Sequence, residues 1–320
     1  MPEPESSRNT AEVCESWQQL VQAVIGIVIV IGAAAMFHYY SPAVAQQTRP
    51  DQLQKQVTQL TQEVEQIQRE QATPALVLSH YRNSIGYISG IYDVGFAREP
   101  ARIRARVSGT GFLVGAGLLA TNRHVAEPWF GDTEAEALIG RGAQPTIESL
   151  EVFFPGSPLP LSLAPGAVSS ADDLAVLRIE DKDAVSGAAV LPLAKNKPPV
   201  GEPVTVIGYP MGVAGMVAKS PAGIYRRLAY RHGDLNAASE LAALSLIRPS
   251  TTCGHLGDIV GGKLIYDAPT AHGGSGGPVF NSDGEVIGVN SAYIDGFSGG
   301  TLGISIDALR PLIEAAKATH

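Results

Sequence analysis

The sequence has very little cysteine, with only Cys14 and Cys253 among 320 residues. Cys14 precedes an apolar segment that we expect to enter a membrane, and Cys253 lies far beyond it, so an intrachain disulfide is not expected. The paired CxxC or HxxxH spacing of zinc sites is also missing. We therefore predict no metal site, and we interpret Cys253 as a packed thiol because free cysteine tends to be buried.

Aromatic residues and basic runs are scarce as well. Phe, Trp and Tyr make up 6% of the chain, and the net charge is −8 with no long run of Lys and Arg. A nucleic-acid partner is therefore not expected. Gly is abundant at 35 residues and Pro at 22, and the hydrophobic fraction is 45%. This composition favours many turns and short strands around an ample core.

The N-terminal region divides into a polar tail and an apolar segment. Residues 1–18 are polar and acidic, and we predict that they are disordered. Residues 20–37 carry no charge and are almost wholly apolar, which is close to the minimum length for a bilayer-spanning helix. Helices buried in soluble cores seldom run this long without a polar face. We therefore predict a transmembrane helix within 19–40.

A cleaved signal sequence is the alternative for residues 1–45, because Ala43-Val44-Ala45 has the small-x-small form of a cleavage site. Against cleavage, the apolar run is long and the segment before it is acidic, with Arg8 as its only basic residue. We favour an uncleaved anchor. In both cases the rest of the chain is expected on the extracytoplasmic, periplasmic side, or secreted after cleavage, although the charge bias across the segment is weak.

Residues 46–74 are predicted to form a short coiled-coil helix, bracketed by Pro50 and Pro74. The seam is shorter than three heptads, so homo-oligomer formation through 51–72 relies on membrane anchoring to raise the effective concentration. A single amphipathic helix lying on the following domain is the alternative. The seam residues, spaced 4, 3, 4 and 3 apart, are Leu53, Val57, Leu60, Val64 and Ile67.

Residues 75–320 differ from the preceding segments in their pattern of apolar and turn residues, and they are predicted to form one all-β domain. Short apolar runs such as GTGFLVGAGLLATN, PVTVIGYP and EVIGVNSAY alternate with Gly/Pro turns, as in a barrel or sandwich. Residues 155–166 are predicted to be a Pro-rich surface loop. Residues 234–247 are predicted to be an inserted amphipathic helix, with Asp234 as its N-cap and Pro249 beyond its end.

The clearest chemical signal is AHGGSGGPVF at 271–280, where Ser275 stands among four glycines just before a strand. Glycines let the chain turn sharply, so the N–H groups of Gly273 and Ser275 can point into one small space. A tetrahedral oxyanion needs such a pair of donors. The alternative is a flexible Gly/Ser loop.

Two further motifs supply a base and a carboxylate. His124 follows the apolar run LLATN, and Asp173 leads into the strand LAVLRI, where strand parity turns Asp173 inward and Asp172 to solvent. A carboxylate beside imidazole holds the tautomer that accepts the serine proton. The order His124, Asp173, Ser275 is that of the chymotrypsin arrangement and differs from subtilisin and the α/β-hydrolases.

Over residues 80–315 the sequence resembles the trypsin-like peptidases of bacteria, in particular the HtrA/Deg group. The resemblance implies two six-stranded antiparallel β-barrels of chymotrypsin type, with the triad at the cleft between them. The group usually continues into PDZ domains, and this sequence is expected to lack one because it ends at His320. The motifs that carry the resemblance are SGTGFLV, ATNRHVA, DLAVLRI, PVTVIGYP, YDAPTAHGGSGGPVFN, GEVIGVNSAY and GTLGISI.

Matching to the family also implies a substrate pocket. Pro269 stands where trypsins place an acid at the pocket base, and Asp267 is the nearest carboxylate. A small or medium apolar residue is therefore expected before the scissile bond, because a buried Lys or Arg would lack a partner. The pocket walls implied by the match are Ser291, Ala292, Tyr293, Gly303, Ile304 and Ser305.

Two features depart from the family. Gly274 occupies the position of the aspartate that receives the new N-terminus in trypsins, so zymogen cleavage of that kind is not expected. The stretch 211–252 is longer than typical, and it could cover the cleft or contact a partner.

Together these residues predict a membrane-anchored serine endopeptidase that works through an acyl-enzyme and needs no metal or organic cofactor. By family analogy its substrates are exported or unfolded polypeptides. The alternative from a different class is a catalytically silent scaffold or binding protein that assembles through 51–72. An esterase using the same triad is the third hypothesis.

Overall fold

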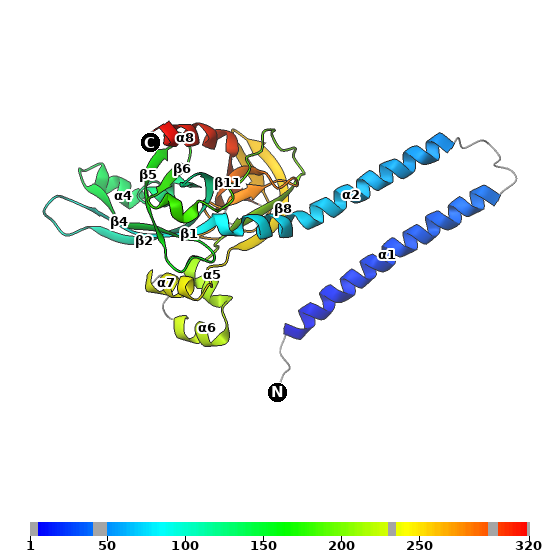
Figure 1. Ribbon diagram of the computed structural model, residues 1–320, viewed down its shortest axis with the longest axis horizontal. Coiled ribbons are helices and arrows are strands. Elements are labelled where there is room, and N and C mark those ends of the chain that lie inside the picture. The colour runs from blue at the N-terminus through cyan, green and yellow to red at the C-terminus, as the bar shows by residue number, and fades with distance from the viewer. Residues whose placement is uncertain (1–5, 41–49, 230–234, 294–299, 319–320) are drawn as a thin grey trace. The chain divides into compact units, whose positions relative to one another are not determined.

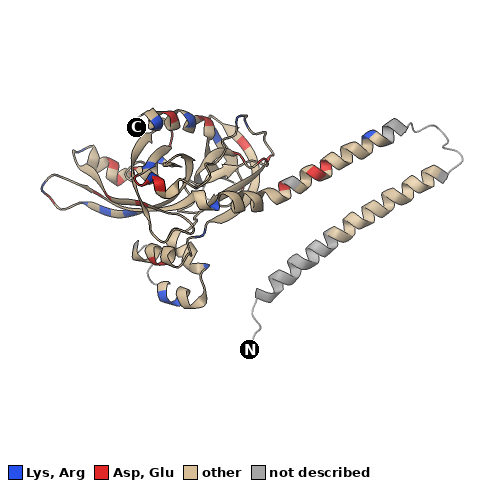
Figure 2. Cartoon of the chain, in the orientation of Figure 1, with Lys and Arg blue, Asp and Glu red and all other residues tan. Residues whose placement is uncertain are grey.

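The computed structural model describes residues 6–40, 50–229, 235–293 and 300–318 (Figure 1). The chain divides into two units, Met1–Val64 and Glu65–His320. In the first unit, helix α1 (Ser6–Tyr40) contains Val21–Tyr39, which is long and apolar enough to cross a membrane. Figure 2 shows no charged side chain along this part of the helix.

The tail predicted to be disordered is helical from Ser6 onward, which corrects that prediction. Once the apolar segment is helical, extension needs no new nucleus, and each added residue gains one backbone hydrogen bond. The possible cleavage motif Ala43-Val44-Ala45 lies outside the described residues.

Helix α2 (Pro50–Tyr81) spans the boundary between the units. Its predicted end at Pro74 is wrong, because the helix continues through this proline. Tertiary contacts hold the extension: Thr73 donates its hydroxyl proton to the carbonyl oxygen of Ser282 at 2.8 Å, Val77 is buried, and Tyr81 stacks on Phe280. These contacts offset the backbone hydrogen bond that a proline removes from a helix.

The heptad seam of α2 faces solvent in the described chain. Val57 and Leu60 are 58% and 59% exposed, and Val64 and Ile67 are exposed to a similar degree. An exposed apolar stripe on a helix can be buried against a partner. The structure of the described chain does not itself contain a coiled coil.

The second unit holds two closed six-stranded antiparallel barrels, as the sequence predicted. The first barrel has the strand order β1-β2-β3-β6-β5-β4. The second, read from β7, has the order β7-β8-β9-β12-β11-β10, so one topology occurs twice. The strands are β1 (Ile85–Gly95), β2 (Ile103–Gly115), β3 (Leu118–Thr121), β4 (Gln144–Phe153), β5 (Leu161–Val168), β6 (Ala175–Ile179), β7 (Pro203–Gly208), β8 (Ser250–Val260), β9 (Lys263–Tyr266), β10 (Pro278–Phe280), β11 (Val286–Tyr293) and β12 (Thr301–Ser305).

The predicted Pro-rich surface loop is only partly a loop. Strand β5 occupies Leu161–Val168 and pairs with β6 along most of its length. Pro165 is tolerated because β5 has little pairing on its other side, where it meets β4 at two positions only. Strand β8 was also missed, and it places Cys253 on the surface, so the prediction of a packed thiol is wrong.

Helices cover the barrels and fill the long insertion. The insertion forms α5 (Gly212–Ala218), α6 (Ala222–Leu228) and α7 (Leu235–Ala243), which confirms the helix predicted near 234–247 although Asp234 lies outside the described residues. Buried residues of α5 and α7 share one apolar cluster with strands of both barrels. The other helices are η1 (Arg82–Ser84), α3 (Arg123–Ala126), α4 (Thr133–Ile139), η2 (Lys182–Val185) and α8 (Ile306–Ala318).

Helix α8 fixes the relation between the barrels. It packs on β5 and β6 of the first barrel and on β11 and β12 of the second, and Figure 1 shows it lying over both. Leu309 and Ile313 are buried on its inner face, and Arg310 donates to the carbonyl oxygen of Ala194. The two barrels therefore form one rigid frame for the residues between them.

Candidate functional site

The three predicted catalytic residues meet at one cleft of about 740 Å³. His124 lies in α3, in the connection from the third to the fourth strand of the first barrel. Ser275 lies in the equivalent connection of the second barrel, between β9 and β10. Asp173 lies just before β6. Because the barrels share a topology, these connections open onto a common space.

The histidine and the aspartate make a close pair. His124 Nδ1 lies 2.7 Å from Asp173 Oδ2, and the backbone N–H of His124 donates to Oδ1 at 2.9 Å. Since a carboxylate can only accept, Nδ1 carries the proton and Nε2 is left as an acceptor. Asp172 turns away and takes part in a turn with Ser169. The structure thus brings Asp173, and not its neighbour, against the imidazole.

The surroundings of Asp173 keep it ionised. Burial raises the pKa of its carboxyl, but hydrogen bonds from His124 and Ser291 outweigh that effect, and the net pKa lies below its usual value. The Ser291 hydroxyl donates to Asp173 Oδ2 at 2.8 Å. The carboxylate is therefore charged at neutral pH and can stabilise an imidazolium.

The hydroxyl of Ser275 does not donate to His124 in this structure. It donates instead to the carbonyl oxygen of Ser291 at 2.9 Å. Both Ser275 and His124 line the cleft, and catalytic hydrogen bonds are often long or misaligned without substrate. Ser291 thus contacts two of the three predicted catalytic residues. Matching to the family had placed Ser291 only in the wall of the substrate pocket.

The N–H groups of the two predicted oxyanion donors have no acceptor in the part of the chain that the structure describes. Along the loop, Gly274 N–H donates to Ala271 and Gly276 N–H donates to Asn290, whereas the N–H groups of Gly273 and Ser275 donate to no described residue. Gly273 has φ +89°, and a Cβ there would lie 2.5 Å from the carbonyl oxygen of Tyr209. Only glycine fits this turn without displacement.

Thr110 ties this loop to the first barrel. Its hydroxyl donates to the carbonyl oxygen of Gly273 at 2.7 Å and accepts from Tyr209 N–H at 3.0 Å. Its own N–H donates to the carbonyl oxygen of Ser275 at 2.8 Å. Thr110 is fully buried on β2. The sequence signal was the SGTGFLV motif, but nothing local indicated a contact with a loop 163 positions away.

A second buried network holds the same loop from within the second barrel. Tyr266 donates its hydroxyl proton to Asn290 Oδ1 at 2.7 Å, and Asn290 Nδ2 donates to Gly274 at 2.8 Å and to Thr270 at 3.0 Å. Burial raises the pKa of the Tyr266 hydroxyl, so it remains a neutral donor. Neutral side chains therefore hold the loop that carries Ser275.

The predicted pocket residues are dispersed along two paired strands. Ser291, Ala292 and Tyr293 end β11 beside Ser275. Ala292 and Tyr293 pair with Leu302 and Thr301, whereas the predicted walls Gly303, Ile304 and Ser305 pair with 288–290. Ile304 belongs to the buried core, and Pro269 is exposed. Asp267 Oδ1 accepts the N–H of His255 on β8.

One basic side chain also lines the cleft. Arg106 lines the cleft on β2 and forms no ion pair with any described residue, and the basic positions of β2 are blue in Figure 2. Arg104, two residues earlier, is instead bound by Glu148 at 2.6 Å. Among the described ranges there is no group of three His, Cys, Asp or Glu side chains that could hold a metal ion.

Comparison with known protein families gives one match. The model of the trypsin-like peptidase domain matches residues 109–289, more than half of the chain. The chain belongs to the trypsin-like peptidase family. The match begins beside Thr110 and ends beside Asn290, so it takes in both loops that face the cleft.

Relatives of the HtrA/Deg group are recognised, as the motifs predicted. The chain is 30% identical over 209 residues to a probable periplasmic serine endoprotease DegP-like of Rhizobium meliloti, covering 65% of this chain and 32% of that protein. It is 29% identical over 219 residues to the mitochondrial serine protease HTRA2 of Drosophila pseudoobscura pseudoobscura, covering 65% and 39%. The chain thus spans only about a third of the length of these relatives.

A solved structure was also matched. The serine endoprotease from Yersinia pestis is 19% identical, with a TM-score of 0.47, and the alignment covers 74% of this chain and 64% of that chain.

Proposed function

We propose that this protein is a serine endopeptidase with Ser275 as nucleophile, His124 as general base and Asp173 as the group that orients the histidine. One observation carries the proposal: the bonded His124–Asp173 pair lines the same cleft as Ser275 and the unbonded N–H group of Gly273. Membership of the trypsin-like peptidase family and relatives named as serine proteases support it.

Each residue has a defined step. The Ser275 hydroxyl turns from Ser291 toward His124 Nε2, loses its proton there and attacks the substrate carbonyl carbon. The N–H groups of Gly273 and Ser275 hold the resulting oxyanion. His124 then gives the proton to the leaving amine, and Asp173 stabilises the imidazolium throughout. Water repeats the sequence on the acyl-enzyme, so the reaction needs no metal or organic cofactor.

A small or medium apolar residue is proposed before the scissile bond. Asp267, the acid nearest to the pocket in sequence, bonds to the backbone of β8 at His255 and so is engaged elsewhere. A Lys or Arg entering the pocket would then lack a carboxylate partner. Exported or unfolded polypeptides are the proposed substrates, by analogy with the relative named as a periplasmic endoprotease.

The N-terminal helices are proposed to anchor and assemble the enzyme. Val21–Tyr39 would cross the membrane and leave the barrels on the periplasmic side. The exposed stripe of Val57, Leu60, Val64 and Ile67 would then bury itself in a homo-oligomeric coiled coil. Cross-linking in membranes tests this assembly, and Leu60→Glu/Val64→Glu is expected to abolish the cross-linked species without changing the fold of the barrels.

The decisive test of the enzyme is labelling with a fluorophosphonate followed by a peptide-library cleavage profile. We expect labelling of the parent chain and none of Ser275→Ala, with cleavage after small apolar residues. Cleavage mainly after Lys or Arg would refute the pocket argument. Absence of labelling under all conditions would favour the scaffold protein, and turnover of short acyl esters without any peptide cleavage would favour the esterase.

A further inference from the structure

The first barrel contains a groove that shares no lining residue with the cleft. It has a volume of about 600 Å³ and lies between β4 and β5, above part of β6. The segment that follows α3 separates the two sites: Glu127 and Trp129 line the groove, whereas Pro128 and Phe130 line the cleft. We call the site the β4–β5 groove.

The groove forms where strands β4 and β5 separate. They are joined at Glu151↔Ser162 and Val152↔Leu161 only, which is the shortest pairing in this barrel. Beyond these two positions the strands diverge, and residues of both line the opening. The facing edges therefore offer N–H and C=O groups that are not bonded to the neighbouring strand, and an added strand can use such groups.

The floor of the β4–β5 groove is the core of the barrel. Leu150, Leu163 and Leu177 line it and belong to the buried cluster of this barrel, while Ile147 and Val168 pack against that cluster from the sides. An apolar side chain that enters the groove would thus meet aliphatic carbon on three sides. A site of this volume accepts a few side chains and no more.

The rim of the groove is acidic. Its lining includes four glutamates and neither Lys nor Arg. Glu127 is paired with Arg123 at 2.7 Å and Glu148 with Arg104 at 2.6 Å. Two of the glutamates, Glu151 and Glu180, form no ion pair with any residue in the described ranges, and so two negative charges remain uncompensated.

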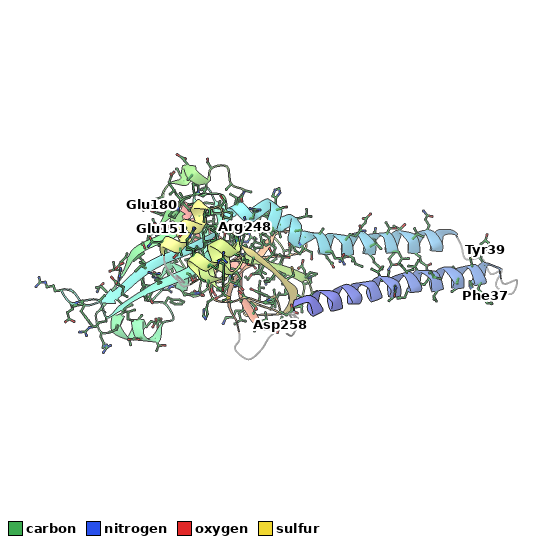
Figure 3. All side chains as sticks on the ribbon, turned by 90° about the horizontal axis from the view of Figure 1, so that it is seen from below. Phe37, Tyr39, Glu151, Glu180, Arg248 and Asp258 are labelled. Atoms are coloured by element: carbon green, nitrogen blue, oxygen red, sulfur yellow. The ribbon has the colours of Figure 1, made fainter. Side chains whose placement is uncertain are left out.

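Strand register places these two charges on one face. Glu151 is opposite Ser162, and the carbonyl oxygen of Ser162 accepts the N–H of Glu180. Residues directly opposite each other share a face of the sheet, so the two carboxylates flank Ser162 at about 10 Å, or two strand spacings. Figure 3 labels both side chains on the same side of the barrel. A cation over Ser162 would interact with both.

We propose that the β4–β5 groove binds an extended polypeptide segment in which apolar side chains flank a Lys or Arg. The segment adds as a strand along a free edge, places its apolar side chains on Leu150, Leu163 and Leu177, and sets its cation between Glu151 and Glu180. Main-chain hydrogen bonds then provide affinity, and the alternating side chains provide specificity. This binding goes beyond the proposed catalysis and does not need it.

The test measures peptide binding with catalysis removed. The full chain carrying Ser275→Ala is titrated against a fluorescein-labelled peptide of alternating Val and Lys, and against matched peptides with Gln or Glu in place of Lys. We expect the Lys peptide to bind most tightly. Glu151→Gln/Glu180→Gln should weaken it by about threefold to tenfold, the effect of losing two partly exposed ion pairs, and should leave the Gln peptide unchanged.

Three further variants separate a specific loss of binding from a loss of folding. Glu134→Gln/Glu314→Gln removes the same charge at exposed positions outside the groove and should not change binding. Glu151→Lys/Glu180→Lys should transfer the preference to the Glu peptide, which an unfolded protein cannot do. Ala164→Trp, which fills the groove from β5, should abolish binding of all three peptides.

The proposal is overturned if the Lys peptide does not bind, if it binds the Gln variant as tightly as the parent, or if Ala164→Trp leaves binding unchanged. Fluorophosphonate labelling of the parent chain reports separately on catalysis. Absence of labelling of the parent chain, together with binding of the Lys peptide, counts against the proposed function alone. Labelling of the parent chain without any binding of the Lys peptide counts against the groove alone.

Discussion

The two barrels have the same strand order but contribute different chemistry. The connection from the third to the fourth strand carries His124 in the first barrel and Ser275 in the second. In the first barrel this connection is a short helix that holds the His124 ring against the Asp173 carboxylate. Asp173 accepts hydrogen bonds from both the side chain and the backbone N–H of His124. In the second it is a glycine-rich turn in which the N–H groups of Gly273 and Ser275 donate to no residue that the structure describes.

The difference teaches how a repeated topology can yield an asymmetric site. In the proposed mechanism, the first barrel holds the groups that move protons, and side chains position them. The second barrel holds the proposed oxyanion donors, and backbone geometry positions them, with Asn290 and Tyr266 hydrogen-bonded to each other and Asn290 to the turn. Substitutions in the first barrel should therefore change proton transfer, whereas those in the second should change oxyanion binding.

The largest effect is expected from Asp173→Asn in the first barrel. An amide cannot hold the required tautomer as the carboxylate does, and we expect kcat to fall by about 10⁴-fold. Asp172→Asn, the adjacent acid that turns away from His124, is the matched control and should keep nearly full activity. Steady-state hydrolysis of the best library peptide measures both, and equal losses in the two variants would contradict the assignment of Asp173.

Gly273→Ala tests the second barrel. The new methyl group would collide with the carbonyl oxygen of Tyr209 at 2.5 Å, so the turn must move and misplace one oxyanion donor. Removing one such donor lowers kcat by about 10² to 10³. Gly142→Ala, at φ +97° with nothing within 4 Å, carries the same backbone strain without the collision. If Gly142→Ala lowers kcat as much, the loss reflects general strain and the oxyanion argument fails.

Thr110→Val tests the link between the barrels. Valine has the same shape but leaves Gly273 C=O and Tyr209 N–H without the hydroxyl. A buried group left unpaired costs about 1–3 kcal/mol, so kcat should fall by about tenfold with little change in KM. Thr110→Ser keeps the hydroxyl and should restore kcat. A fall in KM and kcat alike, without rescue by serine, would indicate a structural role only.

Much of this architecture could be predicted from sequence, for local reasons. Ser275, His124 and Asp173 stand in motifs whose strand context is visible within ten residues, and their order selected one fold. Strand β8 was not predicted because its sequence, STTCGHLGDIV, lacks an apolar run. Strand β5 was not predicted because Pro160 and Pro165 are typical of loops. Each of them nevertheless pairs with the next strand along the chain, β5 with β6 and β8 with β9.

The supporting residues of the site were less predictable. Thr110 and Asn290 act through contacts with the loop around Ser275, and such contacts depend on how the barrels are packed. The helix through Pro74 illustrates the same limit, since Thr73 and Val77 gain partners that only the folded chain supplies. Propensity described each segment alone, and tertiary contacts overrode it.

The smallest effect is expected from acid, and it concerns the first barrel alone. The pKa of Asp173 is lower in the folded chain than in the unfolded chain, where it is about 3.9. The unfolded state therefore binds the proton more readily, and the stabilisation by this carboxylate is complete above about pH 4 and is lost as the pH falls through the folded-state value.

Thermal unfolding of Ser275→Ala and Ser275→Ala/Asp173→Asn between pH 7 and pH 2 measures the contribution. We expect the gap between their midpoints to narrow below about pH 4. A gap of constant width would mean that the charge of Asp173 does not stabilise the barrel. The matched change in the second barrel, Tyr266→Phe, should leave a gap that acid does not alter, because burial keeps that hydroxyl neutral over the whole range.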